Sequence, residues 1–147
     1  NFATERSKYL SNLGIPLNTD STLKGQTVFL AERCAELMNN DIITDRTVID
    51  VMAFTMNAKS IGHYDKEIFE SYAKEFIREY DYIFYISPYG IPMEDNGVRE
   101  TDEHYRDLID FTITTLIKRY SHMANKIEKI SGSTDERVEQ ILKFTNL

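Results

Sequence analysis

Cysteine is almost absent from this sequence, and two other features are missing with it. A single thiol, Cys34, cannot form an intramolecular disulfide, so a disulfide-stapled secreted domain is excluded and a reducing cytoplasm is expected. No apolar run approaches the ~18 residues that a membrane-spanning helix needs, and the first residues lack a signal-peptide pattern. We therefore expect a cytoplasmic protein that has no membrane partner.

Runs of Lys and Arg are also absent. The 147 residues contain 17 basic and 24 acidic side chains, which gives a formal net charge of −7. Such a surface repels phosphates, so we expect no dedicated nucleic-acid binding, although a local basic pocket can still hold a phosphate group. His63, His104 and His122 have no cysteine or second histidine at ligand spacing, which argues against a structural zinc site.

The patterns that are present suit a single α/β domain covering residues 1–147. Short apolar runs at 41–44, 82–86 and 126–130 indicate strands, and stretches with helical spacing separate them. The run at 82–86 is apolar throughout, which is typical of a central strand covered on both faces. Strands joined by helical crossovers predict parallel neighbours in one sheet with flanking helices.

Helix starts carry recognisable capping residues. Thr47 precedes Asp50 by three residues, and Ser133 precedes Glu136 by three, so each pair can satisfy free amides in a first helical turn. Apolar residues recur at helical intervals over 21–38, 65–78 and 101–120.

The stretch 87–100 is long and irregular, with Pro88, Gly90 and Gly97 among its residues. It directly follows the expected central strand, so it should emerge at the carboxyl edge of the sheet, where open α/β sheets bind ligands. A loop of this length inside a compact domain suggests function. Its glycines tolerate the backbone rotations that closure requires, so we expect this stretch to be a mobile lid.

Two charged groups are candidates for chemistry. Asp45 and Arg46 follow the strand at 41–44, so an acid and a base can point into the crevice; alternatively Asp45 caps a helix and Arg46 is a solvated surface charge. Arg99 and Arg106 flank the end of the lid, and paired guanidinium groups can clamp phosphate oxygens. The acidic residues around them offer plain salt-bridge partners as the alternative.

A third candidate is the small-residue turn Ser131-Gly132-Ser133, between the last strand and the last helix. Small side chains there let a ligand ring approach the backbone closely. The same residues also suit an ordinary strand-to-helix turn that binds nothing.

The order of these pieces along the chain is more informative than any one of them. Residues 42–54 are similar to a strand, an Asp-Arg-[Ser/Thr] motif and a helix, and the similarity continues through four later segments and two earlier ones. In this order the sequence resembles the P-loop nucleoside and nucleotide kinase-like proteins of the nicotinamide riboside kinase-like AAA group. The other matching segments are 4–6, 13–17, 80–86, 91–99, 101–106 and 130–137.

The resemblance implies a three-layer P-loop NTPase architecture and transfer of the γ-phosphoryl group of ATP, with Mg²⁺, to a small-molecule nucleoside or nucleotide. The family's first strand, its phosphate-binding loop, the following helix and the second strand have no counterpart here, and the sequence holds no GxxxxGK[ST] motif. Either these residues are part of a longer protein or the protein naturally lacks the loop. We expect the 147 residues alone to be inactive.

The resemblance also implies roles for individual residues. Asp45 would accept the proton of the attacking hydroxyl or bind Mg²⁺ through water, and Arg46 would contact the substrate or its phosphate. Arg99 and Arg106 would be lid arginines that stabilise charge on the transferred group. The lid at 87–100 would carry Arg99 inward when a nucleotide binds. The residues expected near the acceptor are Glu5, Arg6 and Gln26, and those expected beside the adenine are Ser131, Gly132 and Ser133.

Two other functions remain open on the sequence. One is a non-catalytic regulatory or binding module that keeps the kinase scaffold, and the other is an ATPase that hydrolyses nucleotide without an acceptor. Whether the protein forms a homo-oligomer is also open.

Overall fold

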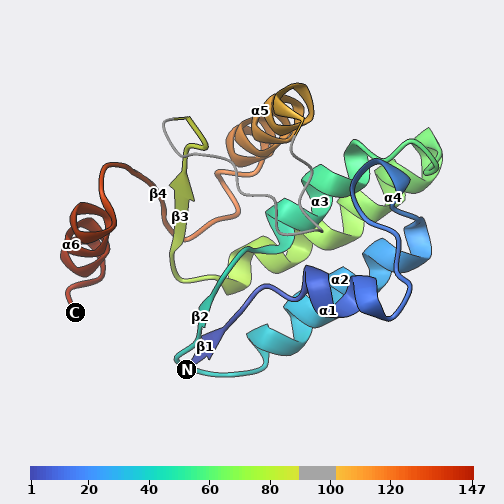
Figure 1. The fold of residues 1–147 in the computed structure, drawn as a ribbon. Helices are drawn as coiled ribbons and strands as arrows, with labels where there is room; N and C mark the ends of the chain where they lie inside the picture. The colour runs from blue at the N-terminus through green and yellow to red at the C-terminus, as the bar shows by residue number, and fades with distance from the viewer. Residues whose placement is uncertain (90–101) are drawn as a thin grey trace.

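The computed structural model describes residues 1–89 and 102–147, in which short strands alternate with helices (Figure 1). The strands are β1 (Phe2–Ala3), β2 (Ile43–Thr44), β3 (Ile83–Ile86) and β4 (Ile127–Ile130). The α-helices are α1 (Ser7–Asn12), α2 (Leu23–Leu37), α3 (Val48–Met56), α4 (His63–Ala73), α5 (Glu103–Arg119) and α6 (Thr134–Thr145). The 3₁₀ helices are η1 (Asn18–Asp20) and η2 (Lys74–Glu79).

The strands form two separate parallel pairs. β1 pairs with β2, with Phe2 opposite Ile43, and β3 pairs with β4, with Ile83 opposite Ile127. The prediction that 82–86 and 126–130 are parallel neighbours is therefore confirmed. The prediction of one sheet that also holds 41–44 is wrong for the described residues, because β2 bonds only to β1 there.

β3 is also not the fully covered central strand that its apolar sequence predicted. Ile83, at its start, is 7% exposed, but Ile86, at its end, is 41% exposed. Within residues 1–89 and 102–147 the strand has a neighbour on one edge only. An apolar sequence shows that a strand can be buried on both faces. Whether it is buried depends on the strands and helices that pack around it.

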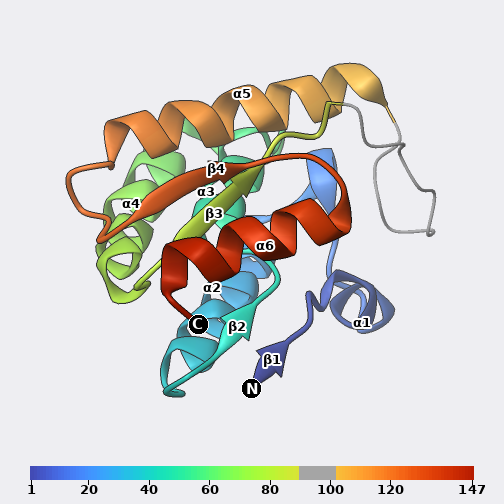
Figure 2. The same ribbon diagram turned by 90° about the vertical axis from the view of Figure 1, so that its left-hand side faces the viewer.

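Helices lie on both sides of the strands. Figures 1 and 2 show α6 on one side and the group α2 to α5 on the other. Both views also show the strands in the order β1, β2, β3, β4 across the molecule, so β2 and β3 are the inner strands. None of the described helices is both long enough and apolar enough to cross a lipid bilayer.

The hydrophobic core is built around α3. Its sequence VIDVMAFTM is apolar on nearly every side, and α2, α4, α5 and η2 all pack against it. Met52 and Val48 are completely buried, and Leu116 from α5 and Ile77 from η2 reach the same core. A helix that is hydrophobic all round is stable only when it is covered all round.

Two predicted helical stripes are buried only in part. In α2, Leu30 is buried, whereas Leu23 and, directly after the helix, Met38 are exposed. In α4, Phe69 is buried, whereas Ile68 is half exposed. The helices themselves are confirmed, although the second of them ends as the 3₁₀ segment η2. Each helix carries apolar residues over a wider part of its surface than the part that packs against α3, so some of them are exposed.

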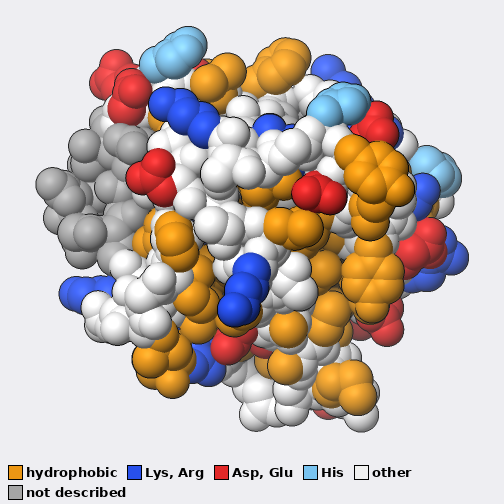
Figure 3. Space-filling view, turned by 90° about the vertical axis from the view of Figure 1, so that its right-hand side faces the viewer, with side chains coloured by type: hydrophobic (Ala, Val, Ile, Leu, Met, Phe, Trp, Pro, Cys, Tyr) orange, Lys and Arg blue, Asp and Glu red, His pale blue; other side chains and the backbone are white. Residues whose placement is uncertain are grey.

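The remaining apolar residues of α4 lie on the surface. Figure 3 shows hydrophobic side chains on the side of the molecule where α4 and the start of α2 lie. Tyr64, Ile68 and Tyr72 are spaced by one helical turn and are 72%, 51% and 62% exposed. Ile68 and Tyr72 border a shallow groove of about 250 Å³ between α2 and α4.

Burial predicts which residues of α5 carry stability. Leu116→Ala should lower the free energy of unfolding by about 2–5 kcal/mol, because a completely buried leucine leaves a cavity when it is truncated. Leu108→Ala on the same helix is the matched control; its side chain is 41% exposed, so the loss should stay below about 1 kcal/mol. Urea denaturation measures both, and similar losses for the two variants would contradict this core.

Candidate functional site

The carboxyl ends of the strands of both sheets point toward one side of the molecule. In Figure 2 the strands run toward the right-hand side, where α1, the first turn of α5 and the β4–α6 turn also lie. This arrangement brings the predicted site residues at 5–6, 45–46, 106 and 131–133 to a common side. Arg99 and positions 90–100 of the predicted lid lie outside the described residues.

Asp45 and Arg46 form the tight connection between β2 and α3. The Asp45 amide donates to the carbonyl of Ala3 at 3.0 Å, and Arg46 has a left-handed backbone with φ of 82°. The Thr44 hydroxyl donates to the Arg46 carbonyl at 2.9 Å. The Asp45 side chain is exposed, and the Arg46 guanidinium lies 5.3 Å from the ring centre of Phe54.

The cap of α3 is provided by other residues. The Thr47 hydroxyl accepts from the Ile49 amide at 3.1 Å, and the Asp50 carboxylate accepts from the Thr47 amide at 2.7 Å. The predicted capping box is therefore confirmed, as is the one at Ser133 and Glu136. The alternative in which Asp45 caps the helix is wrong, and its carboxylate stands free of the cap.

Glu5 and Arg6 follow β1 just as Asp45 follows β2. Because Ala3 is opposite Thr44, these residues lie next to the Asp45–Arg46 connection. Glu5 lies two residues before α1, and its carboxylate accepts from the amide of Ser7 at 2.7 Å and from the Ser7 hydroxyl. The Arg6 guanidinium lies 3.4 Å from the Glu32 carboxylate and 4.3 Å from the ring centre of Tyr9.

Gln26 does not join the other candidates. Its side chain is buried in the interface of α2 and α3, where its amide donates to the Thr55 hydroxyl at 3.1 Å and to the Val51 carbonyl at 3.4 Å. The resemblance implied that Gln26 lies near the acceptor substrate, and at 3% exposure its side chain leaves little surface for a substrate to contact. A helix-to-helix hydrogen bond explains why this polar residue is buried.

Arg106 closes the first turn of α5, beside the end of β3. Its guanidinium lies 5.7 Å from the ring centre of Tyr89, and its Nε is 3.9 Å from the Asp107 carboxylate. That Nε is buried and has no hydrogen-bond partner within the described chain. Tyr85 donates to Asp110, and burial together with this hydrogen bond raises the pKa of Tyr85 to about 12. The contacts join α5 to the carboxyl end of β3.

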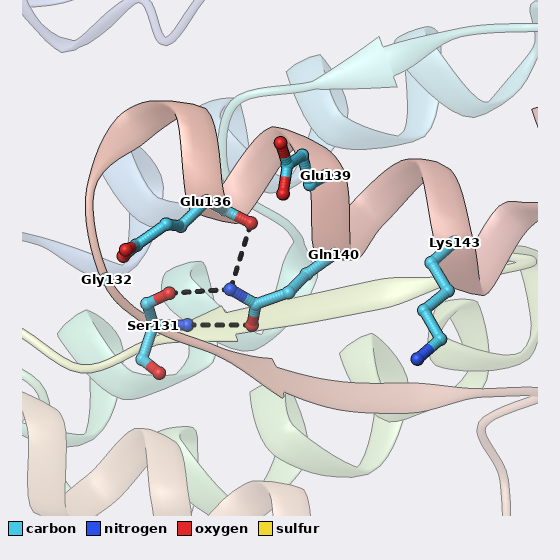
Figure 4. A pocket seen from close by; sticks show the side chains of 6 residues that line it. All are labelled: Ser131, Gly132, Glu136, Glu139, Gln140 and Lys143. Carbon is cyan, nitrogen blue, oxygen red and sulfur yellow. Dashed lines mark hydrogen bonds between the residues drawn. The ribbon is translucent and has the colours of Figure 1, made fainter.

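The turn from β4 to α6 borders an open hollow of about 530 Å³ (Figure 4). The side-chain amide of Gln140 accepts from the Ser131 amide at 3.2 Å and donates to the Ser131 carbonyl at 2.7 Å. Gly132 has φ of 99°, and an added Cβ would lie 2.0 Å from the Glu136 carboxylate. The backbone groups at Ser131 that a ring could bind are therefore already engaged by Gln140.

The described residues offer few side chains that could bind a metal ion. Residues 1–89 and 102–147 contain no cluster of three or more His, Cys, Asp or Glu arranged to hold a metal ion. The exposed Asp45 carboxylate is the group expected to act through water, and one carboxylate with several waters is an ordinary arrangement for Mg²⁺.

Sequence reasoning missed two charged residues of α2. Arg33 is 3% exposed, and it donates from Nη1 to the carbonyl of Asp45 at 3.0 Å. Glu36 pairs with it at 2.7 Å. The burial of Arg33 was readable from its position in the helix. Arg33 follows Gln26 by seven residues and Leu30 by three, so all three lie on the same, buried face of α2.

Comparisons with protein-family models, with curated proteins and with solved structures found no match for this chain.

The two capping boxes should differ in what they stabilise. Thr47→Ala should lower the free energy of unfolding by about 1–2 kcal/mol, because the freed amides begin the central core helix. Ser133→Ala is the matched control: α6 has no buried residue, so it can fray locally, and the loss should stay below about 1 kcal/mol. Urea titration followed by circular dichroism measures both, and an unchanged Thr47→Ala protein would contradict the capped start of α3.

Proposed function

We propose that the protein transfers the γ-phosphoryl group of ATP, with Mg²⁺, to a nucleoside or nucleotide, and that its fold is of the P-loop kinase type. One observation carries the proposal: polar and charged residues from three strand ends and from α5 lie on the carboxyl side of parallel strands. Ligands of open α/β sheets bind on that side. Phosphoryl transfer needs charged groups placed around the substrates more than it needs covalent chemistry.

The open edges of β2 and β3 support the second half of the proposal. Each has one strand partner within residues 1–89 and 102–147, and they are the inner strands of the row (Figure 2). One more parallel strand between them would join the two pairs into a single sheet. Apolar side chains next to this position are exposed, with Ile43 at 67% and Ile86 at 41%. We infer that such a strand carries the phosphate-binding loop, in polypeptide outside these residues.

The side chains on this side of the strands would have different roles in the proposed reaction. Asp45 is exposed at a strand end and free of the helix cap, so it is suited to accept the proton of an attacking hydroxyl or to hold Mg²⁺ through water. Arg46 and Arg6 beside it are suited to bind the acceptor or its phosphate. Arg106 and Arg99 would neutralise charge on the transferred group. ATP supplies the phosphoryl group, and backbone amides with a lysine would hold its phosphates.

The two other functions predict different outcomes with the full-length protein. A binding module would bind nucleotide without turnover, and an ATPase would release phosphate with no phosphorylated acceptor. Product analysis with ATP and a panel of nucleosides and nucleotides separates all three.

Asp45→Asn tests the central role. In the full-length protein it should reduce phosphoryl transfer by ~10²-fold or more, because an amide neither accepts the proton nor binds Mg²⁺ as a carboxylate does. The melting temperature should stay unchanged, since the carboxylate is exposed and outside the cap.

Asp81→Asn is the matched control for that variant. Asp81 is also exposed, but it precedes β3 and so lies at the opposite end of the strands. Its rate should equal that of the wild type. Equal rates for all three proteins would remove Asp45 from the chemistry.

Gln140→Ala tests the adenine position. It frees the Ser131 amide and carbonyl, the same pair of groups that an adenine edge would bind, so ATP affinity should rise by about two- to tenfold. Glu139→Gln changes a residue that borders the same hollow and makes no hydrogen bond to the turn in the described chain, so it should leave the affinity unchanged. Calorimetry measures both, and weaker ATP binding by Gln140→Ala would contradict an adenine site at this turn.

A further inference from the structure

A buried ion pair lies beneath the Asp45–Arg46 connection. The side chain of Arg33 is 4% exposed and that of Glu36 is 10% exposed, and Nη2 of the arginine lies 2.7 Å from Oε1 of the glutamate. Both come from the inner face of α2, one helical turn apart. Charged side chains are rarely buried to this degree, because each loses its hydration on folding.

Stability does not explain this pair. Nε of Arg33 and Oε2 of Glu36 are both buried with no hydrogen-bond partner in the described residues. Burial is the largest influence on Glu36 and raises its pKa, although Arg33 opposes the change. Replacing a buried ion pair by apolar residues of similar size is often neutral or stabilising, so an incompletely bonded pair is a poor source of stability.

Position explains the pair better. Nη1 of Arg33 donates to the Asp45 carbonyl at 3.0 Å, within the connection from β2 to α3. The next residue, Arg46, has the left-handed φ of 82°, which a residue with a side chain adopts only where its surroundings fix it. The other two anchors are the bonds from the Asp45 amide to Ala3 and from the Thr44 hydroxyl to the Arg46 carbonyl.

Each anchor comes from a different part of the fold. β1 holds the amide of Asp45, the end of β2 holds the carbonyl of Arg46, and α2 holds the carbonyl of Asp45 through Arg33. Of the three hydrogen bonds, the one from Arg33 has a charged donor. Such hydrogen bonds are about twice as strong as those between neutral groups. The Glu36 carboxylate binds Nη2 of the Arg33 guanidinium, and this holds the group so that Nη1 points at the Asp45 carbonyl.

We propose that Arg33, held by Glu36, is the positioning residue of the Asp45–Arg46 connection and sets where these two side chains lie at the strand edge. The contacts alone carry the positioning role. Its consequence for catalysis rests on the proposed function, because only there do Asp45 and Arg46 meet a substrate.

The test compares two Arg–Glu pairs of equal spacing in the full-length protein. Arg33→Met with Glu36→Leu removes the buried pair and keeps apolar bulk. Arg78→Met with Glu75→Leu removes an exposed pair, also three residues apart, whose side chains are 59% and 53% exposed. Arg33→Lys keeps the positive charge but has one nitrogen in place of the guanidinium group. It can therefore keep the bond to the Asp45 carbonyl or the ion pair with Glu36, but not both.

Amide hydrogen exchange gives the first readout. Loss of the buried pair should speed exchange at Asp45 by about tenfold relative to the amides of β3 and β4, because one strong anchor of the connection is gone. Arg33→Lys should give an intermediate change, and the exposed pair should give none. Unchanged exchange at Asp45, or an equal change across the whole molecule, would overturn the positioning role.

Phosphoryl transfer gives the second readout. In the buried-pair variant kcat should fall by about tenfold with little change in KM for ATP, because the reacting groups shift while the adenine site does not. A purely structural role would leave kcat of the folded fraction unchanged. If the wild type transfers no phosphoryl group, the proposed function fails, and the exchange data still decide the positioning role.

Discussion

Burial of α3 is the constraint on which the rest of the structure depends. Its nine residues place apolar side chains on nearly every side, so α2, α4, α5 and η2 must all pack against it. The start of the helix is thereby fixed, and the start lies immediately after β2. The exposed Asp45 carboxylate is thus attached to the most deeply buried helix of the core, and sites built on rigid elements are more precise than sites on loops.

The polar contacts around this start are satisfied from several elements. The Thr47 and Asp50 side chains close the first turn, and the Tyr80 hydroxyl accepts from the Val48 amide at 3.3 Å. Burial raises the pKa of Tyr80, so the phenol stays neutral there. Arg33, 3% exposed, supplies a buried positive charge in this region. A helix start inside a core needs such partners, because unpaired buried amides are costly.

Local features were predictable from the sequence, and long-range ones were not. The capping boxes at Thr47 and Ser133 depend on residues three apart, so the sequence alone determines them. Ile43 pairs with Phe2, 41 positions earlier in the chain, and the strand-like pattern held no information on that choice. The buried Arg33 was readable from its helical phase, but its partner, a backbone carbonyl, leaves no trace in the sequence. For the same reason the covering of Ser131 by Gln140 was not foreseen.

The central claim is that one side of the parallel strands binds both ATP and an acceptor. Backbone chemical shifts of the isotope-labelled full-length protein, followed while ATP with Mg²⁺ and then a nucleoside are added, test it most directly. The account predicts shifts at residues 131–133 and 106 on adding ATP, and at 5–6 and 45–46 on adding the acceptor. Shifts confined to the opposite end of the strands, or to the groove between α2 and α4, would contradict it.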